Sequence, residues 1–145
     1  MNLTTLVVES FRVEGSELDL RGDDAWTMCL DQRRFGPRRL VVAFADAEGH
    51  HIGLSHAPRT DPPWYAMACC LDNFGPGPAA AIVYHDEPVA WGPPPPEQLC
   101  AFELARDVAA SYGVHLVDWF ACDDRMYRSM RVAADPEGEW WDLPG

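Results

Sequence analysis

The sequence contains no lysine, and all 11 of its basic residues are arginine. We interpret this bias as a feature of GC-rich coding rather than of function. With 23 acidic residues, the chain has a formal net charge of −12. Because proteins hold the phosphate backbone of nucleic acids through lysine and arginine, this acidic balance argues against a nucleic-acid partner. The one basic cluster, Arg33, Arg34, Arg38 and Arg39, is expected to lie on a solvated helix end and turn.

The chain also lacks a long apolar segment. No run approaches the ~20 apolar residues that a transmembrane helix needs, and residues 1–5 are not a basic segment followed by an apolar one. We therefore expect no membrane partner and a cytoplasmic protein. The 5 cysteines include no Cys-x-x-Cys pair, which argues against a zinc ribbon or a thioredoxin-type motif. We expect reduced, mostly buried cysteines, although the adjacent Cys69 and Cys70 leave a reactive thiol open.

The apolar residues that are present predict one α/β (α+β) domain, a mixed β-sheet with flanking helices. The chain has 145 residues, of which 48% are hydrophobic, enough for a real core. The patterns predict strands over 5–13, 39–45, 50–56, 79–85, 114–121 and 125–131, and helices over 24–34, 61–74 and 96–112. The strand over 39–45 is apolar throughout, which is typical of burial on both faces.

Two of the helices have predicted caps and buried stripes. Asp61 is expected to cap the second helix, with Pro62 in its first turn, and Gly113 to end the third. The residues expected to be buried are Trp64, Met67, Ala68 and Leu71 in the second helix, and Ala101, Phe102, Ala105 and Ala109 in the third.

A candidate metal site lies where the strand over 79–85 ends, in the sequence "AAAIVYHDEP". Residues two apart on a strand share a face, so His85 and Glu87 should project together, with Asp86 opposite. An imidazole and a carboxylate are plausible zinc ligands. A third ligand would come from the first turn of the next helix. There Gln98 should point inward, but a neutral amide is a poor zinc ligand, and Glu97 should face outward.

From about residue 38 to 131 the chain resembles the JAB/MPN metalloprotease fold, closest to the RadC-like branch. The resemblance rests on "AAAIVYHDEP", on "GPPPPEQLCAFELARDVAASYGVHLVDWFACDDRMYRSM" after it, and on the hairpin "FADAEGHHIGLS" before it. It implies a JAB/MPN (cytidine-deaminase-like) architecture and a bacterial source. It also implies a core over 38–131, an N-terminal strand and helix of the same domain over 1–37, and an acidic tail over 132–145.

The resemblance also implies a degenerate metal site. In the family, two histidines and an aspartate hold zinc, and a glutamate activates water. The two histidine positions fall on His85 and Glu87, the serine and aspartate positions of the next helix on Pro95 and Gln98, and the base on Ser55. Only His85 matches by residue type. We therefore predict a non-catalytic domain and expect it to bind no cofactor. It would act as a protein-interaction module that binds a protein partner or a second copy of itself.

The alternative is a divergent zinc-dependent hydrolase, of metallopeptidase or isopeptidase type. It would use His85 and Glu87 as zinc ligands, with Asp86 or Glu97 as base. His51 would complete a rebuilt site if it shared a face with Ser55, although ordinary edge or surface positions are expected for His50, His51 and His56. The zinc deaminases also carry His-x-Glu, but they need a downstream Pro-Cys-x-x-Cys that this chain lacks.

The tail "ADPEGEWWDLPG" holds two adjacent tryptophans, Trp140 and Trp141. Either they fold back onto the domain, or they form a partner-binding segment, since exposed aromatic side chains are costly unless used. The association of the RadC-like branch with DNA repair gives a contextual expectation only, because the acidic charge argues against direct DNA contact.

Overall fold

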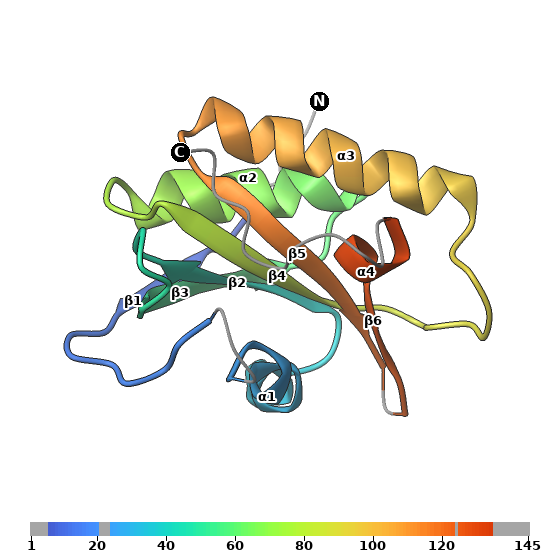
Figure 1. The fold of residues 1–145 in the computed structure, drawn as a ribbon, viewed down its shortest axis with the longest axis horizontal. Coiled ribbons are helices and arrows are strands. Elements are labelled where there is room, and N and C mark those ends of the chain that lie inside the picture. Colours follow the sequence, from blue (N-terminus) through green and yellow to red (C-terminus); the bar gives the residue numbers. More distant parts are fainter. Residues whose placement is uncertain (1–5, 21–23, 124, 135–145) are drawn as a thin grey trace.

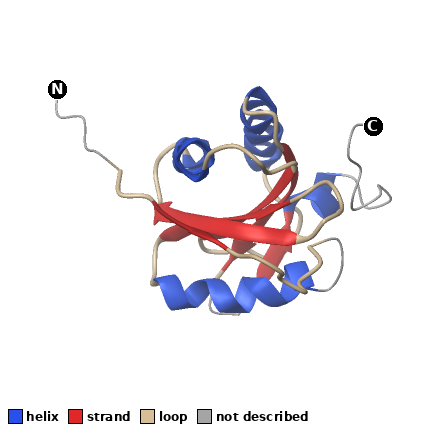
Figure 2. Cartoon of the chain, turned by 90° about the vertical axis from the view of Figure 1, so that its left-hand side faces the viewer, coloured by secondary structure: helices blue, strands red, loops and turns tan. Residues whose placement is uncertain are grey.

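The computed structural model describes residues 6–20, 24–123 and 125–134. Within them the chain forms a six-stranded mixed sheet with helices on both faces (Figures 1 and 2). The predicted α/β class is confirmed. The strands, in the sheet order β1-β3-β2-β4-β5-β6, are β1 (Glu9–Arg12), β3 (His51–Pro58), β2 (Arg39–Ala45), β4 (Ala80–Asp86), β5 (His115–Cys122) and β6 (Tyr127–Ser129). The helices are α1 (Asp24–Asp31), α2 (Pro63–Phe74), α3 (Pro96–Ser111) and α4 (Met130–Ala134), and a 3₁₀ turn spans Gln32–Phe35.

The strands β2 and β4 form the middle of the sheet, and both are buried on both faces. Even-numbered residues of β2, such as Val42 and Phe44, pack on the face covered by α2 and α3. Odd-numbered residues, such as Val41 and Ala43, pack on the face that carries α1. The prediction of a strand buried on both faces is confirmed, because an apolar side chain here always meets a covering layer.

The pairing of β4 with β5 is parallel, whereas the other strand pairs are antiparallel. Parallel neighbours need a crossover connection, and α3 supplies it. The helices α2 and α3 lie side by side over one face of the sheet, and α1 lies on the other (Figure 2). In α3, Phe102, Ala105 and Ala109 are buried as predicted, but Ala101 is exposed. In the described part of the chain, no helix is both long and apolar enough to cross a membrane.

The start of α2 corrects a prediction. The helix begins at Pro63, and Asp61 does not cap it. Instead, Thr60 Oγ1 accepts a hydrogen bond from the Ala66 N–H at 2.9 Å and donates one to the Pro62 carbonyl at 2.8 Å. The hydroxyl of Thr60, one residue before Asp61, therefore serves the first turn of the helix. The buried stripe is Ala66, Met67, Cys70, Leu71 and Phe74, while Trp64 and Ala68, expected in it, are only half-buried.

Two strand boundaries also differ from the prediction. The first strand is shorter than the predicted 5–13, and the last one ends at Ser129 instead of 131. Ser129 accepts a hydrogen bond from the Val132 N–H at 3.1 Å. This is the geometry of a helix N-cap, so the chain turns into α4 at Met130.

An irregularity in β3 decides which of its side chains face which layer. Phe44 pairs with Gly53, but the next residue, Ala45, pairs with His51, so Ile52 is an extra residue in the ladder. The backbone at Gly53 is closely approached: a Cβ there would lie 2.3 Å from the Phe11 carbonyl oxygen and 2.6 Å from the Phe74 ring. The alternation of side chains between the two faces of the sheet is interrupted here, so residues before and after the bulge follow different alternations.

We predict that Gly53→Ala destabilises the fold by about 3 kcal/mol, because the new methyl group meets a backbone oxygen that cannot move aside without shifting β1. Urea denaturation measures the loss. Gly15→Ala is the matched control: Gly15 has φ 65° and open space around its Cβ position, so it carries only the conformational cost of about 1–2 kcal/mol. Equal losses in the two variants would contradict the close packing at Gly53.

Candidate functional site

A pocket of about 200 Å³ lies at the carboxyl end of β4, under α3 and the start of α2. We call it the β4 pocket. Its walls are mainly apolar and include Trp64, Phe102, Leu104, Trp119 and Met130. Three polar side chains also line it: His85, Glu87 and Gln98. A largely apolar cavity with a few convergent polar groups is the usual form of a ligand site.

His85 lies on the face of β4 that α2 and α3 cover, and it is only 3% exposed. Its Nδ1 lies 3.1 Å from Glu87 Oε2, and Trp119 packs edge-on against the imidazole with 5.6 Å between ring centres. Neither ring nitrogen has a partner of hydrogen-bond geometry in the described residues. The Glu87 contact is therefore a close approach of charge to a ring nitrogen and is not an aligned hydrogen bond.

The residues flanking His85 divide between two environments. Glu87 follows the strand, where its N–H donates to the Cys122 carbonyl at 3.0 Å, and its side chain is 25% exposed at the pocket. Asp86 does not line the β4 pocket. Its Oδ2 accepts a hydrogen bond from the Arg38 N–H at 2.5 Å, and its carbonyl accepts one from Arg59 at 2.6 Å. The structure thus brings Glu87 to His85 and anchors Asp86 elsewhere.

The first turn of α3 lies across the pocket from the end of β4. Pro95 precedes the helix and offers no side-chain cap. Gln98 donates its N–H to the Pro95 carbonyl at 3.0 Å, and its side chain lines the pocket. Glu97 is exposed and is not part of the pocket wall. These are the orientations that helical spacing predicts for Gln98 and Glu97.

Ser55 does not lie at the β4 pocket. It is fully buried, and its Oγ is 2.5 Å from that of Ser10. Through the intervening β2, Ser55 is aligned with Val83, whereas His85 is aligned with Ala57. Ser55, the position that the resemblance gives to the general base, therefore lies two strands from His85 in the sheet and is offset from it by two residues along the strand direction.

His51 cannot complete a site with His85, and the hypothesis of a rebuilt site is wrong. His51 borders a recess with Leu54 and Phe35 on the α1 face of the sheet, whereas His85 faces α2 and α3. The reason is the extra residue Ile52, which breaks the alternation that would have put His51 and Ser55 on one face. Burial lowers the pKa of His51.

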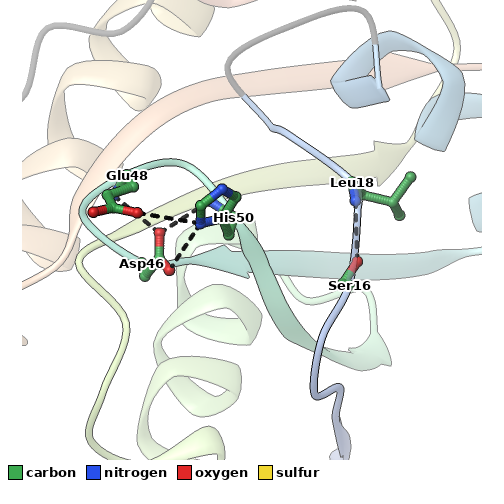
Figure 3. Close-up of polar contacts among 5 residues, drawn as sticks. All are labelled: Ser16, Leu18, Asp46, Glu48 and His50. Carbon is green, nitrogen blue, oxygen red and sulfur yellow. Dashed lines mark hydrogen bonds and ion pairs between the residues drawn. The ribbon is translucent and has the colours of Figure 1, made fainter.

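The other two histidines of the β2–β3 hairpin, His50 and His56, have partners of their own. His50 lies in the turn between β2 and β3, where its Nδ1 is 3.4 Å from Asp46 Oδ2 and 3.5 Å from Glu48 Oε2 (Figure 3). That turn is at the far end of the hairpin from His85. His56 faces the α1 side of the sheet, with its Nε2 3.0 Å from Glu9 Oε2. Its pKa is lowered mainly by burial and, to a smaller extent, by the positive charge of Arg39.

The residues of the β4 pocket do not fit the zinc ion that the resemblance implies. A catalytic zinc site has three protein ligands and an open position for water. Here His85 and Glu87 are two donors, and the remaining polar side chain of the lining is the neutral amide of Gln98. Across residues 6–20, 24–123 and 125–134, no group of three or more His, Cys, Asp or Glu side chains is placed to hold a metal ion.

Asp118 supports the pocket from β5. The resemblance includes an aspartate in this strand, but we predicted no role for it. It is fully buried, and it accepts hydrogen bonds from Ser129 Oγ (2.5 Å), the Trp119 N–H (2.7 Å) and the Arg131 N–H (3.0 Å). These bonds tie β5 to the corner before α4, where Met130 completes the pocket wall. A single acid inside the apolar strand "HLVDWFAC" was the available signal.

None of the described cysteines lines the β4 pocket. Cys70 is buried, and burial raises the pKa of its thiol to about 12, which disfavours the reactive thiolate. The described cysteines at 69, 70, 100 and 122 are unpaired. Trp140 and Trp141 lie outside the described residues, so their proposed role stays a prediction.

We predict a specific pH dependence from Asp118. Burial raises its pKa above the ordinary 3.8, against the opposing effect of its hydrogen bonds and of Arg131. The folded state then holds the proton to higher pH than the unfolded state does. Asp118 therefore contributes most to stability below pH 3.8, and this contribution falls as pH rises through the raised pKa. The free energy of unfolding of the wild type minus that of Asp118→Asn should decrease over this range. Asp107→Asn, an exposed change on α3, is the control. A difference that rises with pH would contradict the prediction.

The chain has no match among known proteins that would assign this site. No family model matches it, no curated protein matches it, and no solved structure matches it. The function must therefore be inferred from the chain's own residues and from their placement around the β4 pocket.

Proposed function

We propose that the protein is a non-catalytic JAB/MPN-like (RadC-like) domain that acts as a protein-interaction module. One observation carries the proposal: the place where a family metal site would lie is a mainly apolar pocket. It presents two candidate ligands, His85 and Glu87, and its remaining polar side chain is the neutral amide of Gln98. A pocket with this lining is better suited to burying an apolar group than to activating water.

The order of elements supports the JAB/MPN architecture. After the β2–β3 hairpin, the chain runs through α2, β4, α3, β5 and β6. His85 ends the central strand, and the first turn of the following helix returns beside it. This is the arrangement that the resemblance implies for the ligand-bearing segments.

The charge supports a protein as the partner. A net charge of −12 opposes association with a polyanion and favours a basic surface. The acidic tail with Trp140 and Trp141 is a second segment that we propose contacts the partner. Self-association remains within the proposal, since a second copy is also a protein partner.

The alternative, a divergent zinc hydrolase, draws on one observation, the 3.1 Å contact between His85 and Glu87. It needs a general base near those ligands. Asp86 is hydrogen-bonded outside the pocket, and Glu97 is exposed away from it. The alternative thus has candidate ligands but no described carboxylate placed to take the proton from water.

We predict that the protein with added zinc hydrolyses neither peptide nor isopeptide substrates above the rate of His85→Ala. The reason is the missing base and third ligand. The measurement is release of a fluorophore from the two substrate types, with wild type and variant prepared identically. Zinc-dependent turnover that disappears in His85→Ala would overturn the non-catalytic proposal.

We also predict that Gln98→Asp gains zinc affinity that the wild type lacks. The change adds a third donor, an anionic carboxylate, to His85 and Glu87 in the pocket lining. At zinc concentrations about 100 times the resulting Kd, the variant should gain about 2.7 kcal/mol in thermal unfolding.

The control for that gain is Glu97→Asp, which alters the neighbouring, exposed position. It should respond to zinc as the wild type does. If Gln98→Asp and Glu97→Asp behaved alike, the first turn of α3 would not occupy the ligand-bearing position that the proposal requires.

A further inference from the structure

The β4 pocket has an unbalanced charge. Of the side chains that line it, Glu87 is the only acid, and no arginine is among them. His85 is the only other group that can ionise. The whole chain carries a net charge of −12, which adds a long-range attraction for cations. The pocket is therefore suited to a group with an apolar body and a positive head.

The walls of the pocket suit a flat cation. Trp64, Phe102 and Trp119 line it from α2, α3 and β5 respectively. The faces of aromatic rings attract cations, tryptophan most strongly, and the guanidinium of arginine is the cation most often found there. The ring of Phe102 already has the Arg106 guanidinium of this chain over it, 5.5 Å from the ring centre. Trp64 and Trp119 are therefore the rings that would hold such a group.

The polar side chains of the pocket can accept hydrogen bonds from a ligand. Glu87 offers carboxylate oxygens and Gln98 an amide oxygen. His85 is 97% buried and has a ring nitrogen without a hydrogen-bond partner in the described residues. An ammonium group has three donors on one atom, whereas a guanidinium has five donors spread over a rigid plane. Several acceptors around one cavity match the guanidinium better.

We propose that the β4 pocket binds the guanidinium of an arginine side chain that a partner protein presents. The proposal rests on the proposed function and names the chemistry of its contact. A cavity of about 200 Å³ is smaller than the roughly 300–1,000 Å³ of typical small-molecule sites. It therefore admits one side chain, with its guanidinium against the tryptophan rings and within reach of Glu87.

The test uses the full chain and three capped pentapeptides, Gly-Gly-Xaa-Gly-Gly, with arginine, citrulline or lysine at the centre. Citrulline has the shape of arginine without its charge. The readout is the NMR signals of the indole N–H groups of Trp64 and Trp119. We expect saturable shifts with the arginine peptide and at least a tenfold weaker Kd for the citrulline peptide. Equal affinities, or no shift with arginine, would overturn the proposal. Lysine binding as tight as arginine would overturn the preference for guanidinium.

Variants separate a local effect from the overall charge. Glu87→Gln keeps the shape of the side chain and should weaken the arginine peptide about tenfold, while leaving the citrulline peptide unchanged. Glu97→Gln removes the same charge from the exposed surface nearby and should change neither peptide by more than about twofold. Thermal unfolding confirms that both variants fold. An equal loss in the two variants would show that only the net charge matters and would contradict a built site.

The outcomes distinguish this inference from the proposed function. Zinc-dependent hydrolysis would remove the proposed function whatever the peptides do. Failure of the arginine peptide, with no hydrolysis found, would remove only the assignment of the ligand. The partner would then contact another surface.

Discussion

The parallel pairing of β4 with β5 is the constraint on which the site depends. Parallel strands cannot be joined by a tight turn, so the chain must cross over one face of the sheet. The crossover is α3, and its first turn comes back beside the carboxyl end of β4. For this reason His85 and Gln98, which are far apart along the chain, line the same pocket. The carboxyl ends of strands are a common location for ligand sites in such sheets.

The interior of the sheet determines the character of that pocket. The strands β2 and β4 are buried on both faces, and this burial extends along β4 as far as His85. His85 is 97% buried there. Among the described residues its ring nitrogens have no aligned hydrogen-bond partner, which is costly in the core, so any hydrogen bond gained from a ligand is worth more. Asp118 supports this region from the next strand by fixing Trp119 and the start of α4. The floor of the pocket is therefore part of the packed core, while its rim includes exposed residues such as Leu104.

Strong periodic signals made most of the fold predictable. The apolar run over 39–45 and the helix over 96–112 gave strands and helices at the right places, since burial and period decide them. The positions where α2 and α4 begin, Pro63 and Met130, were not predicted. The hydroxyls of Thr60 and Ser129 accept hydrogen bonds in the first turns of these helices. Several nearby polar residues could fill the same role, so the sequence does not single out these two. The pairing of His85 with Glu87 follows from strand alternation, which holds locally. The placement of His51 does not follow from alternation, because the extra residue Ile52 moves the side chain of His51 to the opposite face of the sheet. The convergence of Trp64 and Trp119 is a tertiary property that no local pattern carries.

The β4 pocket must be a binding pocket, and not a metal centre, for the proposed function to hold. The most direct test is the metal content of protein purified without chelator, measured by mass spectrometry for the wild type beside His85→Ala. The account predicts no zinc above background in either protein, since the pocket offers two donors and an amide. About one zinc per chain in the wild type, lost in His85→Ala, would contradict it and would return the site to metal chemistry.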